Sequence, residues 1–158
     1  MLAEAHLQEP PLDITVKEDG GVWAQKLGGL LLPTGSIRLS DHRGGVTDLP
    51  GYREGAWWVQ DVAATLPVRL LGPVASKHII DLCAAPGGKT LELAALGARV
   101  TAVDRSKPRL RRMQENLDRT GLSADLIQAD ATQWTPDFTP DAILVDAPCS
   151  ATGTLRRH

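Results

Sequence analysis

The residues with the clearest chemical potential form one short stretch, Asp81-Leu82-Cys83-Ala84-Ala85-Pro86-Gly87-Gly88-Lys89-Thr90. The apolar run 78–82 leads into it, and an apolar helical segment, about 90–96, follows it. A strand, a tight glycine turn and a helix open a βαβ unit of the nucleotide-binding type. Glycines let the backbone approach a ligand, and a helix N-terminus offers free N–H groups to a polar ligand end. The turn is neither a G-x-G-x-x-G dinucleotide motif nor a complete Walker A loop.

Three aspartates, Asp104, Asp130 and Asp146, each follow a predicted strand. The carboxyl ends of parallel strands meet at one edge of the sheet, where open α/β sheets place their ligand contacts. Asp104 lies 17 residues beyond Gly87, about the spacing at which an acid meets ribose hydroxyls. The alternative for Asp104 is a strand-end acid that caps the next turn, and Asp130 alone resembles an ordinary loop aspartate.

The stretch from Asp81 to Thr90 resembles the first motif of RNA cytosine-5 methyltransferases, the family that includes the bacterial RsmB ribosomal RNA enzymes. Residues 146–158, Asp-Ala-Pro-Cys-Ser-Ala-Thr-Gly-Thr-Leu-Arg-Arg-His, are similar to the fourth motif of that family. The two motifs have the order and spacing of the family, and the resemblance covers residues 36–158. It implies S-adenosyl-L-methionine as cofactor, formation of 5-methylcytosine as reaction, and RNA, in particular 16S ribosomal RNA, as partner.

The resemblance also implies roles for single residues. The turn would hold the methionine portion of the cofactor, Asp104 its ribose and Asp130 its adenine side. The implied cofactor-binding set is Cys83, Ala84, Ala85, Pro86, Gly87, Gly88, Lys89, Asp104, Arg109, Asp130 and Asp146. The implied catalytic set is Lys89 and Asp146, which would contact the base, and Cys149, which would assist product release. The implied RNA-binding set is Arg156, Arg157 and His158.

The chemistry explains why a thiol matters. Cytosine C5 is a poor nucleophile, whereas a thiolate that adds to C6 makes an enamine-like intermediate able to accept a methyl group. Loss of the C5 proton then restores aromaticity, and this sequence needs an activated thiol, a donor near N3 and a base. Asp-Pro-Pro-Tyr at residues 146–149 would have indicated amino-group methylation, whereas the Cys149 thiol favours carbon. In the family the attacking cysteine belongs to a later Thr-Cys motif, so we expect this chain to bind cofactor without turnover.

Some residues keep a simpler interpretation. Cys83 is interpreted as a small packed residue and not as a nucleophile. Lys89 is either a solvated lysine or a functional one, since a cation is unfavourable in the first turn of a helix. The adjacent Trp57 and Trp58 pack domains together or stack on bases. The basic residues Arg105, Lys107, Arg109, Arg111 and Arg112 form a solvated helix face or contact phosphates.

Strands and helices must alternate to position these residues. We predict strands at 78–82, 99–103, 124–128 and 141–145, and helices at 61–71 and 90–96. A further helix begins near Ser106, buries Leu110, Met113 and Leu117 on one face, and ends at Gly121. Short connections of this kind predict an α/β fold with a parallel sheet. It is an incomplete Rossmann-like methyltransferase fold of about four parallel strands, preceded by a small β-rich N-terminal module.

The predicted organisation has two parts. The resemblance implies that residues 1–55 are a partial RNA-binding-like module. Within them the residue pattern predicts a strand at 12–17, a short helix at 22–27 and a strand at 36–39, and the run 28–35 is a turn or an irregular strand. Residues 56–158 are the N-terminal half of the methyltransferase domain. About three further strands are expected in such a domain, which predicts a fragment of a longer enzyme whose strand 142–145 lacks one neighbour.

The composition is that of an ordinary globular protein, with 42% hydrophobic and 23% charged residues. A net charge of −2 gives no global attraction to nucleic acid, so RNA contact needs a local basic patch. Two cysteines in motif turns suit a reducing cytoplasm. We expect neither a membrane span nor a metal, and no feature indicates an oligomeric state.

Two other functions remain open. One is a Rossmann-like methyltransferase with a small-molecule or protein substrate. The other is a non-catalytic module that binds RNA or cofactor.

Overall fold

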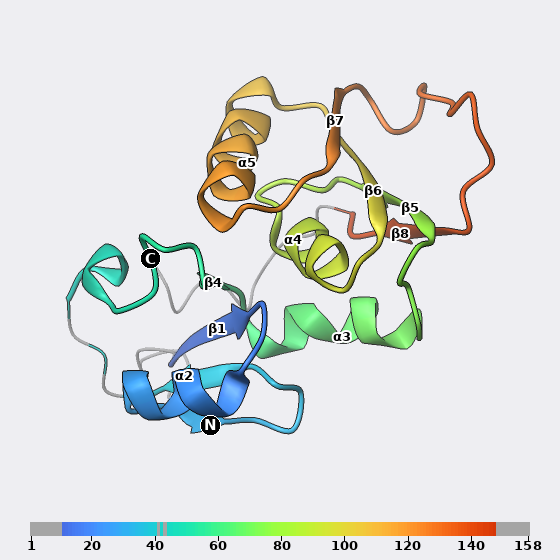
Figure 1. The fold of residues 1–158 in the computed structure, drawn as a ribbon. Helices are drawn as coiled ribbons and strands as arrows, with labels where there is room; N and C mark the ends of the chain where they lie inside the picture. The colour runs from blue at the N-terminus through green and yellow to red at the C-terminus, as the bar shows by residue number, and fades with distance from the viewer. Residues whose placement is uncertain (1–10, 41, 43, 148–158) are drawn as a thin grey trace, which may run out of the picture.

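Two modules pack side by side in the computed structural model, which describes residues 11–40, 42 and 44–147 (Figure 1). The first module holds an antiparallel sheet in the order β2-β3-β1-β4. Its strands are β1 (Leu12–Val16), β2 (Leu30–Leu31), β3 (Ile37–Leu39) and β4 (Trp57–Val59). Helix α2 (Gly20–Leu27) and a 3-10 turn, η1 (Val46–Asp48), complete it. Ile14, Ala24, Ile37, Leu39 and Trp57 form its core.

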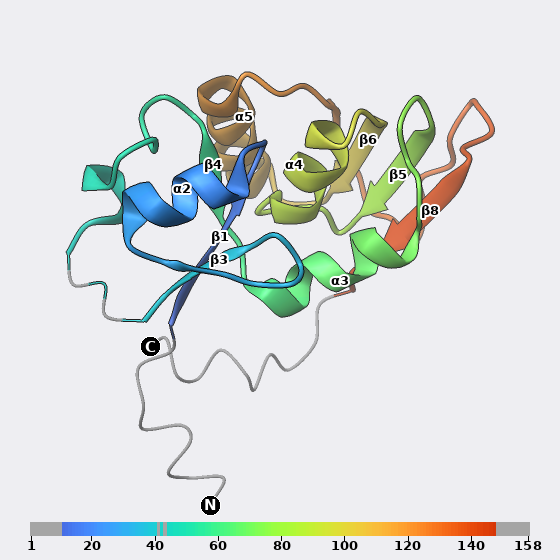
Figure 2. The same cartoon turned by 60° about the horizontal axis from the view of Figure 1, so that its bottom comes forward.

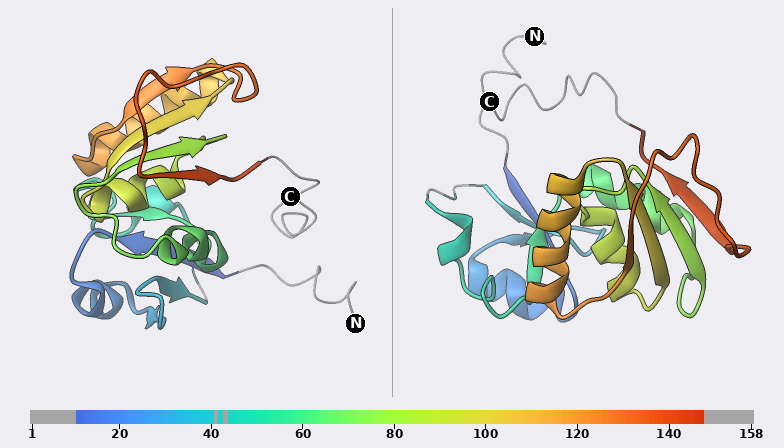
Figure 3. Two further views of the ribbon diagram at one scale, coloured as in Figure 1. Left: turned by 90° about the vertical axis from the view of Figure 1, so that its right-hand side faces the viewer. Right: turned by 90° about the horizontal axis from the view of Figure 1, so that it is seen from above.

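The second module is a parallel sheet in the order β7-β6-β5-β8. Its strands are β5 (His78–Leu82), β6 (Arg99–Asp104), β7 (Asp125–Gln128) and β8 (Ala142–Val145). Helices α3 (Val62–Leu70), α4 (Gly88–Ala95) and α5 (Lys107–Thr120) supply the rest of its core. Seen from above, α4 and α5 lie on the same side of the sheet (Figure 3). The predicted α/β fold with a small β-rich N-terminal module is confirmed.

The pattern of apolar residues explains these elements. Strand β6 is buried from Val100 to Asp104, as both faces of a parallel strand usually are. On α5, Leu110, Met113 and Leu117 are buried as predicted, and Gly121 ends the helix in the left-handed conformation. Within the described residues β8 pairs only with β5, and its Ile143 and Val145 are 51% and 61% exposed.

Several predicted boundaries were wrong by one or two residues. Helix α4 begins at Gly88 and not at Thr90, while strand β6 continues through Asp104. Ser106 holds the N-cap position of α5, but its side chain makes no capping hydrogen bond. The Asp104 Oδ1 atom accepts from the Ser106 backbone N–H at 2.9 Å instead. The run 28–35 contains the two-residue strand β2, whose side chains are exposed.

The adjacent tryptophans join the modules. Trp57 is buried in the N-terminal core and Trp58 in the core of the parallel sheet, because successive side chains of a strand point to opposite faces. This confirms the packing interpretation. Strand β4 pairs with β1 in the N-terminal sheet. Its residues, 57–59, nevertheless lie on the methyltransferase side of the predicted module boundary, which follows residue 55. The boundary itself stays a prediction.

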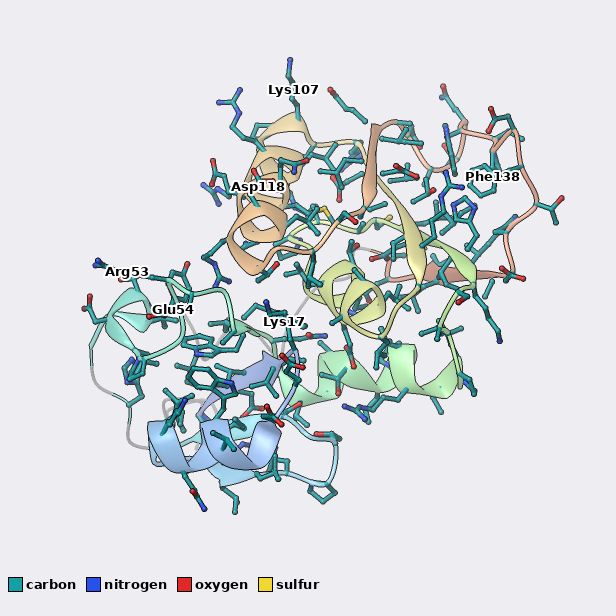
Figure 4. All side chains as sticks on the ribbon, in the orientation of Figure 1. Lys17, Arg53, Glu54, Lys107, Asp118 and Phe138 are labelled. Carbon is teal, nitrogen blue, oxygen red and sulfur yellow. The ribbon has the colours of Figure 1, made fainter. Side chains whose placement is uncertain are left out.

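Further contacts at this junction come from the end of α5. Arg119 donates from Nη1 to the carbonyl oxygens of Tyr52, at 2.6 Å, and Trp57, at 3.0 Å. Its guanidinium lies 4.1 Å from the centroid of the Tyr52 ring. Lys17, between the modules in Figure 4, donates from Nζ to the Thr120 carbonyl at 2.8 Å. Figure 2 shows α3 and β1 near each other on the other side of the junction.

No helix within the described ranges has the length and apolar character needed to cross a membrane.

Candidate functional site

The turn between β5 and α4 has an unusual backbone. Cys83 has φ 60°, the Ala85–Pro86 peptide is cis, and Gly87 has φ 107°. A Cβ atom on Gly87 would lie 2.8 Å from Met113 Cγ, so only glycine suits both the conformation and the space. The Ala84 N–H donates to the Val103 carbonyl at 3.1 Å, which ties the turn to β6. The turn is thus built as a rigid loop at the carboxyl edge of the sheet.

Asp104 is buried behind this turn. Its Oδ2 accepts from the Ala85 N–H at 3.1 Å and its Oδ1 from the Ser106 N–H. Arg109 lies 3.5 Å from Asp104 Oδ2 and also donates to the Ala85 carbonyl. Asp104 therefore caps the next turn, the simpler alternative raised from the sequence. Ribose binding stays a prediction, and it is compatible with this role because a carboxylate can accept about four hydrogen bonds.

Lys89 and Asp146 meet across the end of the sheet. Lys89 Nζ donates to Asp146 Oδ2 at 2.6 Å, with Lys89 in the first turn of α4 and Asp146 directly after β8. The acid offsets the cost of placing a cation at the positive end of a helix. The structure thus joins two of the three residues predicted to be catalytic.

A cavity of about 240 Å³ lies beside this pair. Its walls come from the β5–α4 turn and, opposite, from the segment that joins β4 to α3. The lining residues are Val59, Gln60, Asp61, Ala64, Asp81, Cys83, Ala84, Ala85, Pro86, Gly88, Lys89 and Asp146. Most of the predicted cofactor-binding residues are therefore in one place. Gly87, Asp104, Arg109 and Asp130 are not among the lining residues. Gly87 is part of the turn, and Asp104 and Arg109 both bond Ala85 within it.

Asp81 is a member of the site that the sequence analysis did not single out. Its side chain is buried; Oδ2 accepts from the Thr90 hydroxyl at 2.6 Å, while Oδ1 has no hydrogen-bond partner among the described residues. Burial raises the pKa of Asp81 to about 6, against the opposing effects of the Thr90 hydrogen bond and Lys89. An acid inside the apolar run Ile-Ile-Asp-Leu was the available signal.

Glu92 is the second buried acid that was missed. It accepts from Gln60 Nε2 at 2.9 Å through Oε2, and its Oε1 lies 3.8 Å from Arg69 Nε. Burial raises its pKa to about 7, although Gln60, Arg69 and Lys89 act in the opposite direction. The signal in the sequence was a glutamate flanked by Leu91 and Leu93 in a short apolar helix.

Other predicted residues lie elsewhere. Asp130 is exposed outside the cavity, and hydrogen bonds from the Thr132 hydroxyl and N–H lower its pKa. Arg105 is exposed on the surface, whereas Arg109 donates to the Ala85 carbonyl in the β5–α4 turn. Lys107 points outward from the start of α5 (Figure 4). Cys149, Arg156, Arg157 and His158 lie outside the described residues.

Comparison with known proteins places this geometry in a family. A family model described as 16S rRNA methyltransferase RsmB/F matches residues 68–158, from α3 to the end of the chain. The chain belongs to the RsmB/F family of 16S rRNA methyltransferases. The match includes both the β5–α4 turn and Asp146, so the cavity lies largely within the part that this RsmB/F chain shares with its family.

Curated relatives agree with this assignment. The chain is 52% identical over 118 residues to ribosomal RNA small subunit methyltransferase B of Serratia proteamaculans, and 50% identical over 115 residues to that of Salmonella arizonae. These alignments cover 72% and 70% of this chain but only 28% and 27% of the relatives. The RsmB/F chain thus spans less than a third of the length of these proteins.

Solved structures show the same architecture. A methyltransferase homologue from Pyrococcus horikoshii superimposes with a TM-score of 0.81 at 26% identity, covering 99% of this chain and 56% of that one. NSun6 from the same organism, solved with SFG, gives a TM-score of 0.61 at 38% identity over 68% of this chain and 29% of its own. The N-terminal module and the parallel sheet therefore both occur in a known methyltransferase arrangement.

Proposed function

We propose that this chain forms the S-adenosyl-L-methionine-binding part of an enzyme that methylates C5 of a cytosine in 16S ribosomal RNA. The observation that carries the proposal is the Lys89–Asp146 pair at a cavity walled by the glycine turn. The relatives from Serratia and Salmonella are named for methylation of the small-subunit ribosomal RNA, and NSun6 was solved with SFG.

The residues present suit this cofactor. Gly87 and Gly88 keep the turn free of side chains, and helix α4 points its free N–H groups toward the cavity edge. Asp81 brings a buried oxygen that has no partner among the described residues, and Asp146 adds a second acid at the cavity. Such acids favour a ligand that carries ammonium and sulfonium charges. Bound there, the cofactor would supply an electrophilic methyl group.

Residues of this chain would also bind the base and assist release of the product. Lys89 and Asp146 stand where a base could be bound, one as a donor and the other as an acceptor of hydrogen bonds. Their mutual ion pair holds the two side chains together at the cavity. Cys149, three residues beyond Asp146, would assist product release. Neither cysteine of the 158 residues stands in a Thr-Cys motif, so we propose that the attacking thiol lies outside them.

The first test is calorimetric titration of S-adenosyl-L-methionine into the chain and into Asp104→Ala. We expect saturable binding that Asp104→Ala abolishes, because the substitution frees the Ala85 and Ser106 amides and removes the partner of Arg109. Asp125→Ala is the matched control, since Asp125 is an exposed acid on neighbouring strand β7. Absence of binding to a wild-type chain that is folded by circular dichroism would contradict the cofactor assignment.

The second test addresses the base. The full-length enzyme is incubated with 5-fluorocytidine-substituted ribosomal RNA and S-adenosyl-L-methionine, and a covalent adduct is sought by denaturing electrophoresis. An adduct is expected, because fluorine at C5 blocks the release step after methyl transfer. Cofactor binding without an adduct would favour a non-RNA substrate or a binding module without catalysis.

A further inference from the structure

Gln60 occupies the point where the two modules and the cavity meet. Its backbone N–H donates to the Asp13 carbonyl of β1 at 3.1 Å. The Asp13 carboxylate reaches the next element too, because its Oδ2 accepts from the N–H of Val62, the first residue of α3, at 3.1 Å. The N-terminal sheet therefore determines where the segment from Gln60 to Val62 lies.

The side chain of Gln60 is bonded at both ends of its amide group. Oε1 accepts from the Trp58 indole Nε1–H at 2.7 Å. Nε2 donates to Glu92 Oε2 at 2.9 Å and lies 3.4 Å from the Ala64 carbonyl. Gln60 is 5% exposed and Glu92 3% exposed, so these bonds form away from water and fix the amide in one orientation. The chain Trp58–Gln60–Glu92 thus runs from β4 to the middle of α4.

Gln60 also touches the beginning of α4. A Cβ atom on Gly88 would lie 3.4 Å from both Cγ and Cδ of Gln60, which places the glutamine directly over the residue before Lys89. Gln60 lines the cavity together with its neighbours Val59 and Asp61. Any shift of the N-terminal sheet would therefore move one wall of the cavity toward or away from the glycine turn.

We infer that Gln60, anchored by Glu92 and Trp58, is a positioning residue that makes cofactor binding depend on how the N-terminal module is docked. The inference rests on the proposed function, since it concerns the same cavity. The burial of Glu92 supports this inference. A buried acid is costly unless it is hydrogen-bonded, and the hydrogen bond of Glu92 comes from Gln60. The N-terminal module then acts as a part of the cofactor site, through the position it gives to Gln60 and through Val59 of β4, which also lines the cavity.

The test compares S-adenosyl-L-methionine binding to four chains by calorimetry. Gln60→Met keeps a similar volume but removes the hydrogen bonds of the amide to Trp58, Glu92 and the Ala64 carbonyl. It is expected to raise the dissociation constant about tenfold. Gln60→Glu places two carboxyl groups together and is expected to weaken binding similarly. The double variant Gln60→Glu/Glu92→Gln exchanges donor and acceptor between the two side chains, so binding should recover in large part from the loss in Gln60→Glu. It should stay below wild type, because the Ala64 carbonyl loses its donor and Arg69 its acid. Asp125→Asn is the control for an acid-to-amide change far from the cavity.

A spectroscopic measurement separates positioning from general destabilisation. The chain has four tryptophans, so its indole N–H signals form a simple nitrogen–proton spectrum, with Trp58 assigned by Trp58→Phe. Saturating S-adenosyl-L-methionine should shift the Trp58 signal and leave that of Trp23, which packs in the N-terminal module, in place. Glu92→Gln alone should shift the Trp58 signal without any ligand.

The outcomes are distinct. If the wild-type chain does not bind S-adenosyl-L-methionine, the proposed function fails and this inference fails with it. If the wild-type chain binds but Gln60→Met binds equally well, or the exchange variant does not recover, the inference alone is overturned. A folded Gln60→Met chain that binds weakly, together with recovery in the exchange variant, supports it.

Discussion

Buried carboxyl groups are costly, and two of them contact the region of α4: Asp81 on β5 and Glu92 on α4 itself. Asp81 meets Thr90, the third residue of the helix, while Glu92 points toward the N-terminal module through Gln60. Both have raised pKa values, about 6 and about 7, because burial disfavours their charged forms. Neither contributes to the stability of the fold in its charged form as much as an apolar residue would. Asp81 lines the cavity, and Glu92 bonds Gln60, which lines it, so both acids are connected to the candidate site.

Glu92 should make stability depend on pH in a predictable direction. Between pH 4.5, its unfolded value, and about pH 7, the unfolded chain releases a proton that the folded chain keeps. The free energy of unfolding should therefore fall as pH rises through this window, by up to about 3 kcal/mol for a shift of this size. Urea unfolding of wild type and Glu92→Gln at pH 5, 6, 7 and 8 checks this. As pH rises, the free energy of unfolding of Glu92→Gln should increase relative to that of wild type. A difference that does not change with pH would contradict the raised pKa of Glu92.

The Thr90 hydroxyl should contribute more to the free energy of unfolding than an exposed threonine hydroxyl that also donates to an aspartate. Thr90→Val leaves Asp81 without its hydrogen bond and should cost about 2 kcal/mol at pH 8, as loss of a buried hydrogen bond to a charged group does. Thr132→Val is the matched control, because its hydroxyl bonds the exposed Asp130, and it should cost less than about 0.5 kcal/mol. Chemical denaturation measures both. Equal losses would show that the burial of Asp81 does not matter.

At the scale of elements, the β5–α4 turn depends on one glycine. Gly87→Ala combines a positive φ with a Cβ atom 2.8 Å from Met113 on α5, so it should lower the free energy of unfolding by more than about 2 kcal/mol and weaken cofactor binding. Gly121→Ala has a positive φ but open space around the added atom, and should cost about 1 kcal/mol. Thermal unfolding ranks the two. A smaller loss for Gly87→Ala than for Gly121→Ala would contradict the packing argument.

The elements that the sequence predicted well are those with a local physical cause. Strand β5 was predicted with its observed bounds because both faces of a parallel strand are apolar, and α5 because its buried residues follow the helical period. The strand β2 remained ambiguous, since its two leucines are exposed and no pattern distinguishes them from a turn. The helix begins after Ser106 as predicted, but the Ser106 side chain makes no capping hydrogen bond, and its backbone N–H donates to Asp104 of the preceding strand.

The candidate site divides in the same way. The turn, Lys89 and Asp146 were found because they stand in two motifs, and the fold then brought them to one cavity. Gln60, Asp81 and Glu92 were missed because their roles come from pairing across elements. Gln60 and Glu92 are 32 residues apart, and only the packing of the segment after β4 against α4 makes them partners. Such pairs have no local signal in a single sequence.

At the scale of the molecule, two small cores are joined through one strand and one helix end. Trp57 and Trp58 send neighbouring side chains into different cores, while Arg119 on α5 bonds carbonyl oxygens of the N-terminal module. Gly55 lies directly against the Arg119 carbonyl and leaves no room for a side chain there. Burial lowers the pKa of Arg119, but a guanidinium stays charged, so its bonds at the junction are charge-assisted.

We therefore expect the two modules to unfold as one unit, and Arg119 to be needed for this. Arg119→Met keeps the apolar stem but leaves the Tyr52 and Trp57 carbonyls without their donor and removes the contact with the Tyr52 ring. The loss should be about 2–3 kcal/mol, because the hydrogen bonds are charge-assisted and partly buried. In scanning calorimetry the wild-type chain should show equal calorimetric and van't Hoff enthalpies, and Arg119→Met should separate the transition into two steps.

Arg53→Met is the control, because Arg53 is an exposed arginine of the N-terminal module, and this variant should keep a single transition. A single transition in Arg119→Met would mean that the paired tryptophans alone couple the cores.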